Sequence, residues 1–99
     1  MLVIDAVQAV GRIPIDMSAG YADYLILSSH KIGGPKGVGA IIAAADLMMP
    51  KPLINGGGQE KGHRGGTENL AAIAGFGASA RQACAGLQTM PCRTRRRRK

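Results

Sequence analysis

The 99-residue sequence predicts an α/β fold with a mostly parallel sheet and flanking helices. Three short segments predict the sheet: residues 2–5, 24–28 and 38–43 are rich in apolar residues and do not alternate with polar ones. Continuous apolar strands indicate burial on both faces, as in sheets covered by helices. A fourth segment, from about residue 68, has the apolar spacing of a helix.

The first predicted strand, residues 2–5, ends in an acid, Asp5. A connection follows, in which we expect one or two turns of helix. Gly11, Pro14 and Gly20 interrupt this connection, as turn residues do. The connection is therefore expected to lead directly from the first strand to the second.

The second predicted strand stops at the polar cluster "SSHK", residues 28–31. The next residues, "IGGPKG", predict a tight turn, because Gly33 and Gly34 tolerate positive φ and Pro35 presets a bend. The third strand begins after this turn. Lys31 is thus expected between a buried strand and a turn.

A glycine-rich connection precedes the predicted helix, with six glycines between Gly56 and Gly66. Thr67 is the expected N-cap of the helix, with Glu68 in its first turn. Helical spacing groups four apolar or small residues on one face: Leu70, Ile73, Ala74 and Gly77. The many alanines and glycines predict close packing of this helix on a neighbour.

The positive charge of the sequence is concentrated at its end. The formal net charge is +7, and six basic residues lie within positions 93–99. Before them, seven Lys and Arg residues face six acids, so the body is close to neutral with a charge of +1. We expect residues 91–99 to be a disordered Arg-rich tail, because clustered arginines repel and bury little surface. Nonspecific contacts of this tail are the only nucleic-acid binding expected.

The cysteines and the N-terminus predict a cytoplasmic protein. Cys84 and Cys92 fit no metal-ligand spacing, and we expect two free thiols and no metal site. Residues 1–8 lack the basic start of a signal peptide. The longest apolar run, about residues 70–80, is shorter than the roughly 18–20 residues that span a bilayer.

The polar residues after the first two strands suggest a reactive amine. If these strands are parallel, Asp5 and Lys31 emerge at the same edge of the sheet, where α/β proteins bind ligands. Pyridoxal phosphate requires an amine for its aldehyde, an acid near its ring nitrogen and donors for its phosphate. Lys31 and Asp5 supply the first two, and Ser28 and His30 could donate to the phosphate. Neither the Walker A pattern nor the dinucleotide fingerprint fits the glycine segments.

Three segments together resemble one enzyme family. "DAVQAVGRIPID", "ADYLILSSHKIGGPKGVGAI" and "GGGQEKGHRGGTEN" resemble the cysteine desulfurases, which belong to the class V aminotransferase branch of the fold-type I pyridoxal-phosphate enzymes. The resemblance extends from residue 1 to about residue 83. It implies that residues 1–90 are a fragment of the large cofactor-binding domain of such an enzyme.

The resemblance also implies that six residues bind pyridoxal 5′-phosphate: Asp5, Gln8, Ser28, His30, Lys31 and Thr67. Lys31 is the expected catalytic residue, which holds the cofactor covalently and moves the α-proton of the substrate. Asp5 pairs with the ring nitrogen, and Gln8 contacts the ring hydroxyl. Ser28 and His30 hold the phosphate, while the threonine reaches the phosphate of the partner subunit's cofactor.

The activity implied is removal of sulfur from L-cysteine, which gives alanine and an enzyme persulfide. The expected setting is a homodimer that delivers sulfur to an acceptor or scaffold protein, for iron–sulfur cluster assembly or another sulfur pathway. The family's chains are several times longer, and neither Cys84 nor Cys92 matches the family's nucleophile. We therefore expect a truncated or frameshifted reading frame whose product is inactive alone.

Three other interpretations remain open on the sequence. The first is a selenocysteine lyase or another class V aminotransferase-type enzyme. The second is a basic-tailed nucleic-acid-binding fragment, which the arginine-rich tail favours and the presence of only three aromatic residues opposes. The third is a translated remnant without activity.

Overall fold

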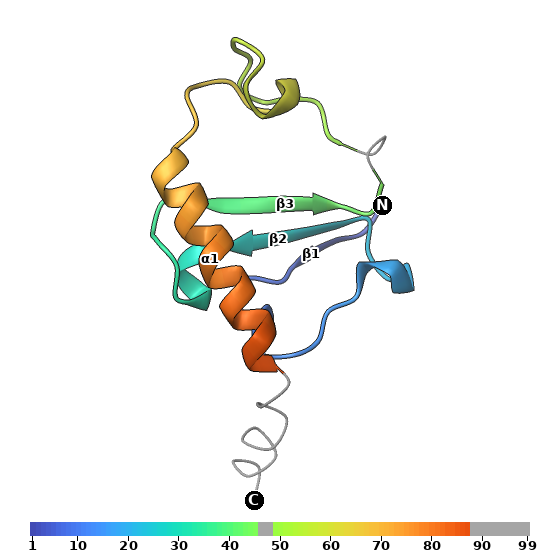
Figure 1. Ribbon diagram of the computed structural model, residues 1–99. Helices are drawn as coiled ribbons and strands as arrows, with labels where there is room; N and C mark the ends of the chain where they lie inside the picture. Colours follow the sequence, from blue (N-terminus) through green and yellow to red (C-terminus); the bar gives the residue numbers. More distant parts are fainter. Residues whose placement is uncertain (46–48, 88–99) are drawn as a thin grey trace, which may run out of the picture.

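The computed structural model describes residues 1–45 and 49–87. Within these residues, β1 (Val3–Asp5), β2 (Tyr24–Ser28) and β3 (Gly39–Ala43) form one sheet in the order β1-β2-β3. The helix α1 (Leu70–Leu87) lies near the end of the sheet at which β2 terminates (Figure 1). The three strands lie where the sequence predicts them, and the α/β fold class is confirmed.

The sheet is mixed, whereas the sequence predicted a mostly parallel one. β1 and β2 are parallel, with Asp5 opposite Ile26. β2 and β3 are antiparallel, with Ser28 opposite Gly39. The physical reason is the short connection between β2 and β3, because a parallel crossover needs roughly a dozen or more residues. Only residues 29–38 join β2 to β3, so the chain turns back beside the strand it has just left.

The prediction of a largely buried sheet is correct only for the start of the central strand. Ala6, Ala22 and Leu25 form the buried core. In the outer strands, Val3 is 46% exposed and Ile41 is 53% exposed. The reason is the position of α1, which packs near one end of the sheet and leaves much of both outer strands uncovered.

Small residues bring α1 close to the segment after β2. A single 3-10 turn, η2 (Ser29–Ile32), follows β2 directly. A Cβ added to Gly34 would overlap Ser29 Oγ and stand 2.5 Å from Ser79 Oγ on α1. A Cβ on Gly75 would stand 2.6 Å from Pro35 Cγ. The predicted packing of the helix through alanine and glycine is therefore confirmed.

The buried face of α1 differs from the predicted one. Its buried residues are Ala72 and Ser79. Leu70 is 73% exposed and Ile73 is 38% exposed, although the apolar spacing placed both on the packing face. Close approach to the turn at Gly34 requires small side chains, so the larger ones lie on other faces of the helix.

The N-cap of α1 is Asn69 rather than the predicted Thr67. The Oδ1 atom of Asn69 accepts a hydrogen bond from Ala72 N at 3.2 Å, and its carbonyl oxygen accepts one from Ile73 N at 2.9 Å. Thr67 and Glu68 lie in the connection before the helix. Asn and Thr both suit the cap position, so the sequence alone did not distinguish between them.

We expect Asn69→Ala to lower the free energy of unfolding by about 1 kcal/mol, because it leaves an amide of the first turn without its side-chain acceptor. Thr67→Ala is the matched control and should change stability less. Urea unfolding followed by circular dichroism measures both variants. A larger loss for Thr67→Ala than for Asn69→Ala would show that the helix begins earlier.

Among the described residues, two further short 3-10 turns lie in the connections. In η1 (Met17–Ala19), Asp16 Oδ1 accepts hydrogen bonds from Ser18 Oγ at 2.6 Å and from Ser18 N at 2.9 Å, and these bonds lower the pKa of Asp16. In η4 (Gln59–Gly62), Glu60 and Lys61 both adopt left-handed backbone angles, with φ of 49° and 56°. Over the described ranges, the helices are too short or too polar to span a membrane.

Candidate functional site

The parallel pairing of β1 and β2 brings four of the predicted site residues to one edge of the sheet. Asp5 ends β1 and Ser28 ends β2, and parallel strands end at the same edge. His30 and Lys31 follow at once in η2. From the sequence we expected this arrangement if the two strands were parallel. The structure shows that β1 and β2 are parallel.

Ser28 and His30 are joined directly. Ser28 Oγ and His30 Nδ1 lie 2.9 Å apart, a hydrogen-bond distance, and the direction of the bond depends on the imidazole tautomer. His30 is exposed and Ser28 is half-buried. A hydroxyl and an imidazole are thus held together at the open edge of the sheet, as a phosphate ligand would require.

The carboxylate of Asp5 is oriented by the turn that follows β1. Its Oδ1 atom accepts a hydrogen bond from Val7 N at 3.0 Å. The turn closes through bonds to the carbonyl oxygen of Ala6, from Ala9 N at 3.0 Å and Val10 N at 2.9 Å. Gln8 is exposed within this turn. Asp5 and Gln8 therefore belong to one short hydrogen-bonded segment.

Lys31 lies within η2, directly after the strand. Ser29, which lies two residues before Lys31, is fully buried. The turn ends at Gly33, whose φ of 86° is left-handed and whose N–H donates to the carbonyl oxygen of Ser29. Glycine adopts this conformation without the steric cost that a Cβ would bring. A buried serine and a left-handed glycine thus fix the backbone on both sides of the lysine.

Arg12 also belongs to this site, although sequence reasoning assigned it no role. Its Nη1 atom donates to the carbonyl oxygen of Gln8 at 3.1 Å, and its Nη2 atom donates to that of Lys31 at 3.3 Å. The available signal was an arginine four residues after Gln8, directly after the left-handed Gly11. That signal does not reveal the second acceptor, which comes from another part of the chain.

In the described part of the chain, Thr67 and Cys84 are not joined to this group. Thr67 is exposed in the connection before α1, and within residues 1–45 and 49–87 no hydrogen bond or ion pair joins it to the other predicted site residues. Cys84 is a free thiol, exposed on α1. Cys92 and the predicted tail at 91–99 lie outside the described residues.

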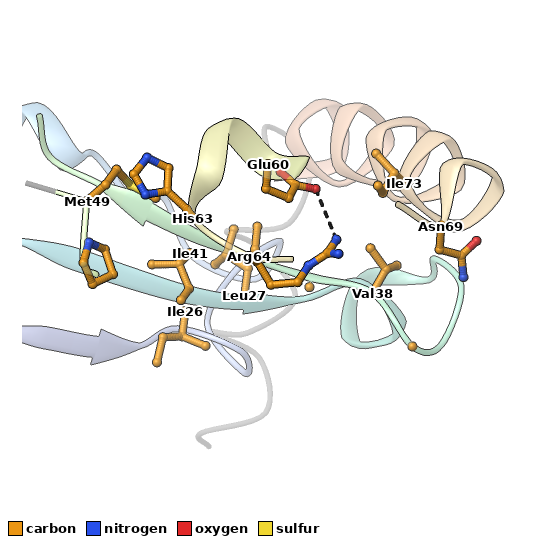
Figure 2. Close-up of a pocket in the computed structure, with 14 residues that line it drawn as sticks. Ile26, Leu27, Val38, Ile41, Met49, Glu60, His63, Arg64, Asn69 and Ile73 are labelled. Carbon is orange, nitrogen blue, oxygen red and sulfur yellow. Dashed lines mark ion pairs between the residues drawn. The ribbon is translucent and has the colours of Figure 1, made fainter. Parts of the chain in front are cut away.

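A separate hollow of about 560 Å³ lies over the face of β2 and β3 (Figure 2). Ile26 and Ile41 form part of its floor. The loop above it carries an ion pair, with Arg64 Nη2 3.6 Å from Glu60 Oε1, and Arg64 Nη1 donates to Gly66 O at 2.6 Å. None of the six predicted cofactor residues lines this hollow. It is an apolar sheet face partly covered by a loop and is distinct from the sheet-edge site.

The donors at the sheet edge fit pyridoxal phosphate by their chemistry. Asp5 offers an oriented carboxylate for a protonated ring nitrogen, and Lys31 offers an amine for an aldehyde. The Ser28–His30 pair offers polar hydrogens for a phosphate. The residues present therefore suit this cofactor.

Comparison with known proteins places the chain in a family. The family model described as "Aminotransferase class-V" matches residues 1–96. A cysteine desulfurase of Frankia sp. (strain EuIK1) is 51% identical over 78 residues, which are 78% of this chain and 19% of that protein. The chain thus spans about one fifth of the length of this relative.

Solved structures agree with the sequence comparison. A NifS-like protein superimposes with a TM-score of 0.81 at 40% identity, over 90% of this chain and 24% of that one. A structure titled as SspA in complex with cysteine has a TM-score of 0.72 at 41% identity, over 80% of this chain and 23% of that one. The matched family model covers nearly the whole sequence, and the fold agrees: the chain belongs to the class V aminotransferase family.

Proposed function

We propose that this chain forms the cofactor-holding part of a pyridoxal-phosphate-dependent cysteine desulfurase. The observation that carries the proposal is the sheet edge at which the parallel strands β1 and β2 end, with Asp5 after one strand and Ser28, His30 and Lys31 at the end of the other. This edge occurs in a sequence 51% identical to a cysteine desulfurase over 78 residues. The reaction takes the sulfur of L-cysteine onto the enzyme as a persulfide and leaves alanine.

The bound cofactor would supply an electron sink for the substrate's α-carbon. Lys31 holds the cofactor through its amine and moves the α-proton as a general base. Asp5 keeps the ring nitrogen protonated, since a carboxylate favours a neighbouring cation. Ser28 and His30 donate to the phosphate, and Gln8 contacts the ring hydroxyl.

The proposal extends to the assembly. Thr67 is exposed at the start of the α1 region, which suits a role at the phosphate of a partner subunit's cofactor in a homodimer. Residues 1–90 would be part of the large domain, and residues 91–99 would lie outside it. We place the enzyme in the cytoplasm, where it would pass sulfur to an acceptor or scaffold protein, for iron–sulfur cluster assembly or another sulfur pathway.

A hybrid enzyme tests this function. The 78 matched residues of this chain would replace the corresponding segment of the Frankia cysteine desulfurase. We expect the hybrid to form alanine and sulfide from L-cysteine in the presence of pyridoxal phosphate. Activity with selenocysteine alone would favour the selenocysteine lyase alternative. A folded dimer that retains bound cofactor but acts on neither substrate would contradict the proposal.

A further inference from the structure

Arg12 contacts two short turns of the chain. Gln8 lies within the turn after β1, which continues to Ile13, and Lys31 lies near the end of η2. The carbonyl oxygens of Gln8 and Lys31 accept from the Arg12 guanidinium at 3.1 Å and 3.3 Å. Carbonyl groups at the ends of helical turns lack partners within the turn. A guanidinium is planar and carries five donors, so one side chain can serve two such acceptors at once.

The backbone beside Arg12 is held in place by packing. Gly11 has a φ of 74°, and a Cβ added there would stand 3.2 Å from both Ile32 Cγ2 and Ala83 Cβ. The turn after β1 therefore packs against both η2 and α1. This packing is independent of the hydrogen bonds, and it joins the same two segments.

We propose that Arg12 is a positioning residue that fixes the backbone of Lys31 relative to the segment Asp5–Gln8. Asp5 and Gln8 are anchored in the turn after β1, and Lys31 belongs to η2. The two carbonyl contacts of Arg12 hold these segments together at the edge of the sheet. This inference rests on the proposed function, because the arrangement matters by placing the Lys31 amine that holds the cofactor.

The first test uses the unmodified 99-residue chain without cofactor. NMR correlations transmitted through hydrogen bonds should link the η-protons of Arg12 to the carbonyl carbons of Gln8 and Lys31. Arg12 and Arg81 are both exposed. Exchange of the Arg12 η-protons with water should nevertheless be slower than that of Arg81, because the Arg12 guanidinium donates to two carbonyl oxygens. Fast exchange equal to that of Arg81, with no correlation to Lys31, would overturn the inference.

The second test compares Arg12→Gln, Arg12→Lys and the control Arg81→Gln in the same chain. Each protein is treated with pyridoxal phosphate and then borohydride, and mass spectrometry gives the ratio of labelled Lys31 to labelled Lys36. We expect Arg12→Gln to lower this ratio by about three- to tenfold, as expected for the loss of charge-assisted hydrogen bonds. Arg12→Lys keeps the charge without the planar fork and should give an intermediate ratio.

The outcomes separate this inference from the proposed function. An unchanged ratio in Arg12→Gln would overturn the positioning role. A general loss of folding would bring Lys31 and Lys36 to similar labelling and would also lower the ratio, so circular dichroism is recorded for each variant. For a variant that has lost its fold, the NMR test of the unmodified chain decides. Absence of label on Lys31 in the unmodified chain would contradict the proposed function, while the NMR test would still decide whether Arg12 joins the two segments.

Discussion

Lys31→Ala is expected to abolish cofactor attachment and to lower kcat/KM of the hybrid desulfurase by at least 10²–10⁴-fold, roughly the range of a general-base contribution. The variant loses the amine that we propose both holds the cofactor and moves the α-proton. Absorbance of the reduced cofactor on the denatured protein measures attachment, and alanine formation measures turnover.

Lys36→Ala is the matched control for this prediction. Lys36 lies five residues further along, is exposed in the turn before β3, and has no proposed role at the cofactor. Its loss should leave attachment and turnover near those of the unmodified hybrid. Equal loss in both variants, or full attachment in Lys31→Ala, would show that another amine holds the cofactor.

Gly34→Ala is expected to destabilise the chain by about 1–3 kcal/mol, the usual cost of overpacking a close contact. The added Cβ would overlap Ser29 Oγ and stand 2.5 Å from Ser79 Oγ, and Ser29 is fully buried with little room to move. Urea unfolding of the 99-residue chain measures the change. Adding Ser29→Gly to the variant should recover part of the loss, because it removes the nearest obstructing atom.

Gly77→Ala supplies the comparison for Gly34→Ala. Gly77 lies within α1, and the nearest atom to its added Cβ is Arg81 Nη1 at 3.8 Å, an ordinary contact. The same chemical change should therefore stabilise the chain by about 0.5–1 kcal/mol, since alanine favours helix over glycine. A similar response of both variants would mean that the turn at Gly34 does not pack against α1 as closely as described.

The strands could be predicted because their signal is local. The apolar segments at 2–5, 24–28 and 38–43 differ from β1, β2 and β3 by no more than one residue at either end. The antiparallel return of β3 and the exposure of Val3 and Ile41 could not be predicted in the same way. The direction of β3 depends on how far the ten-residue connection 29–38 can span. The exposure of the outer strands depends on which elements cover the sheet.

The site was predictable to the extent that it follows from strand ends. Asp5 and Ser28 share an edge because β1 and β2 are parallel, and His30 and Lys31 follow Ser28 in sequence. The hydrogen bond from Arg12 to the Lys31 carbonyl was not predictable, because the two residues are 19 positions apart. Contacts of this kind depend on packing of distant segments, which local sequence patterns do not encode.

We propose that Lys31 holds the cofactor at this sheet edge. Peptide mapping of the hybrid enzyme, after incubation with pyridoxal phosphate and reduction with borohydride, tests this directly. We expect the phosphopyridoxyl group on the peptide that contains Lys31, in a yield that approaches one per chain. Its recovery on Lys36 or on a lysine outside this segment, with Lys31 unmodified, would show that Lys31 does not hold the cofactor.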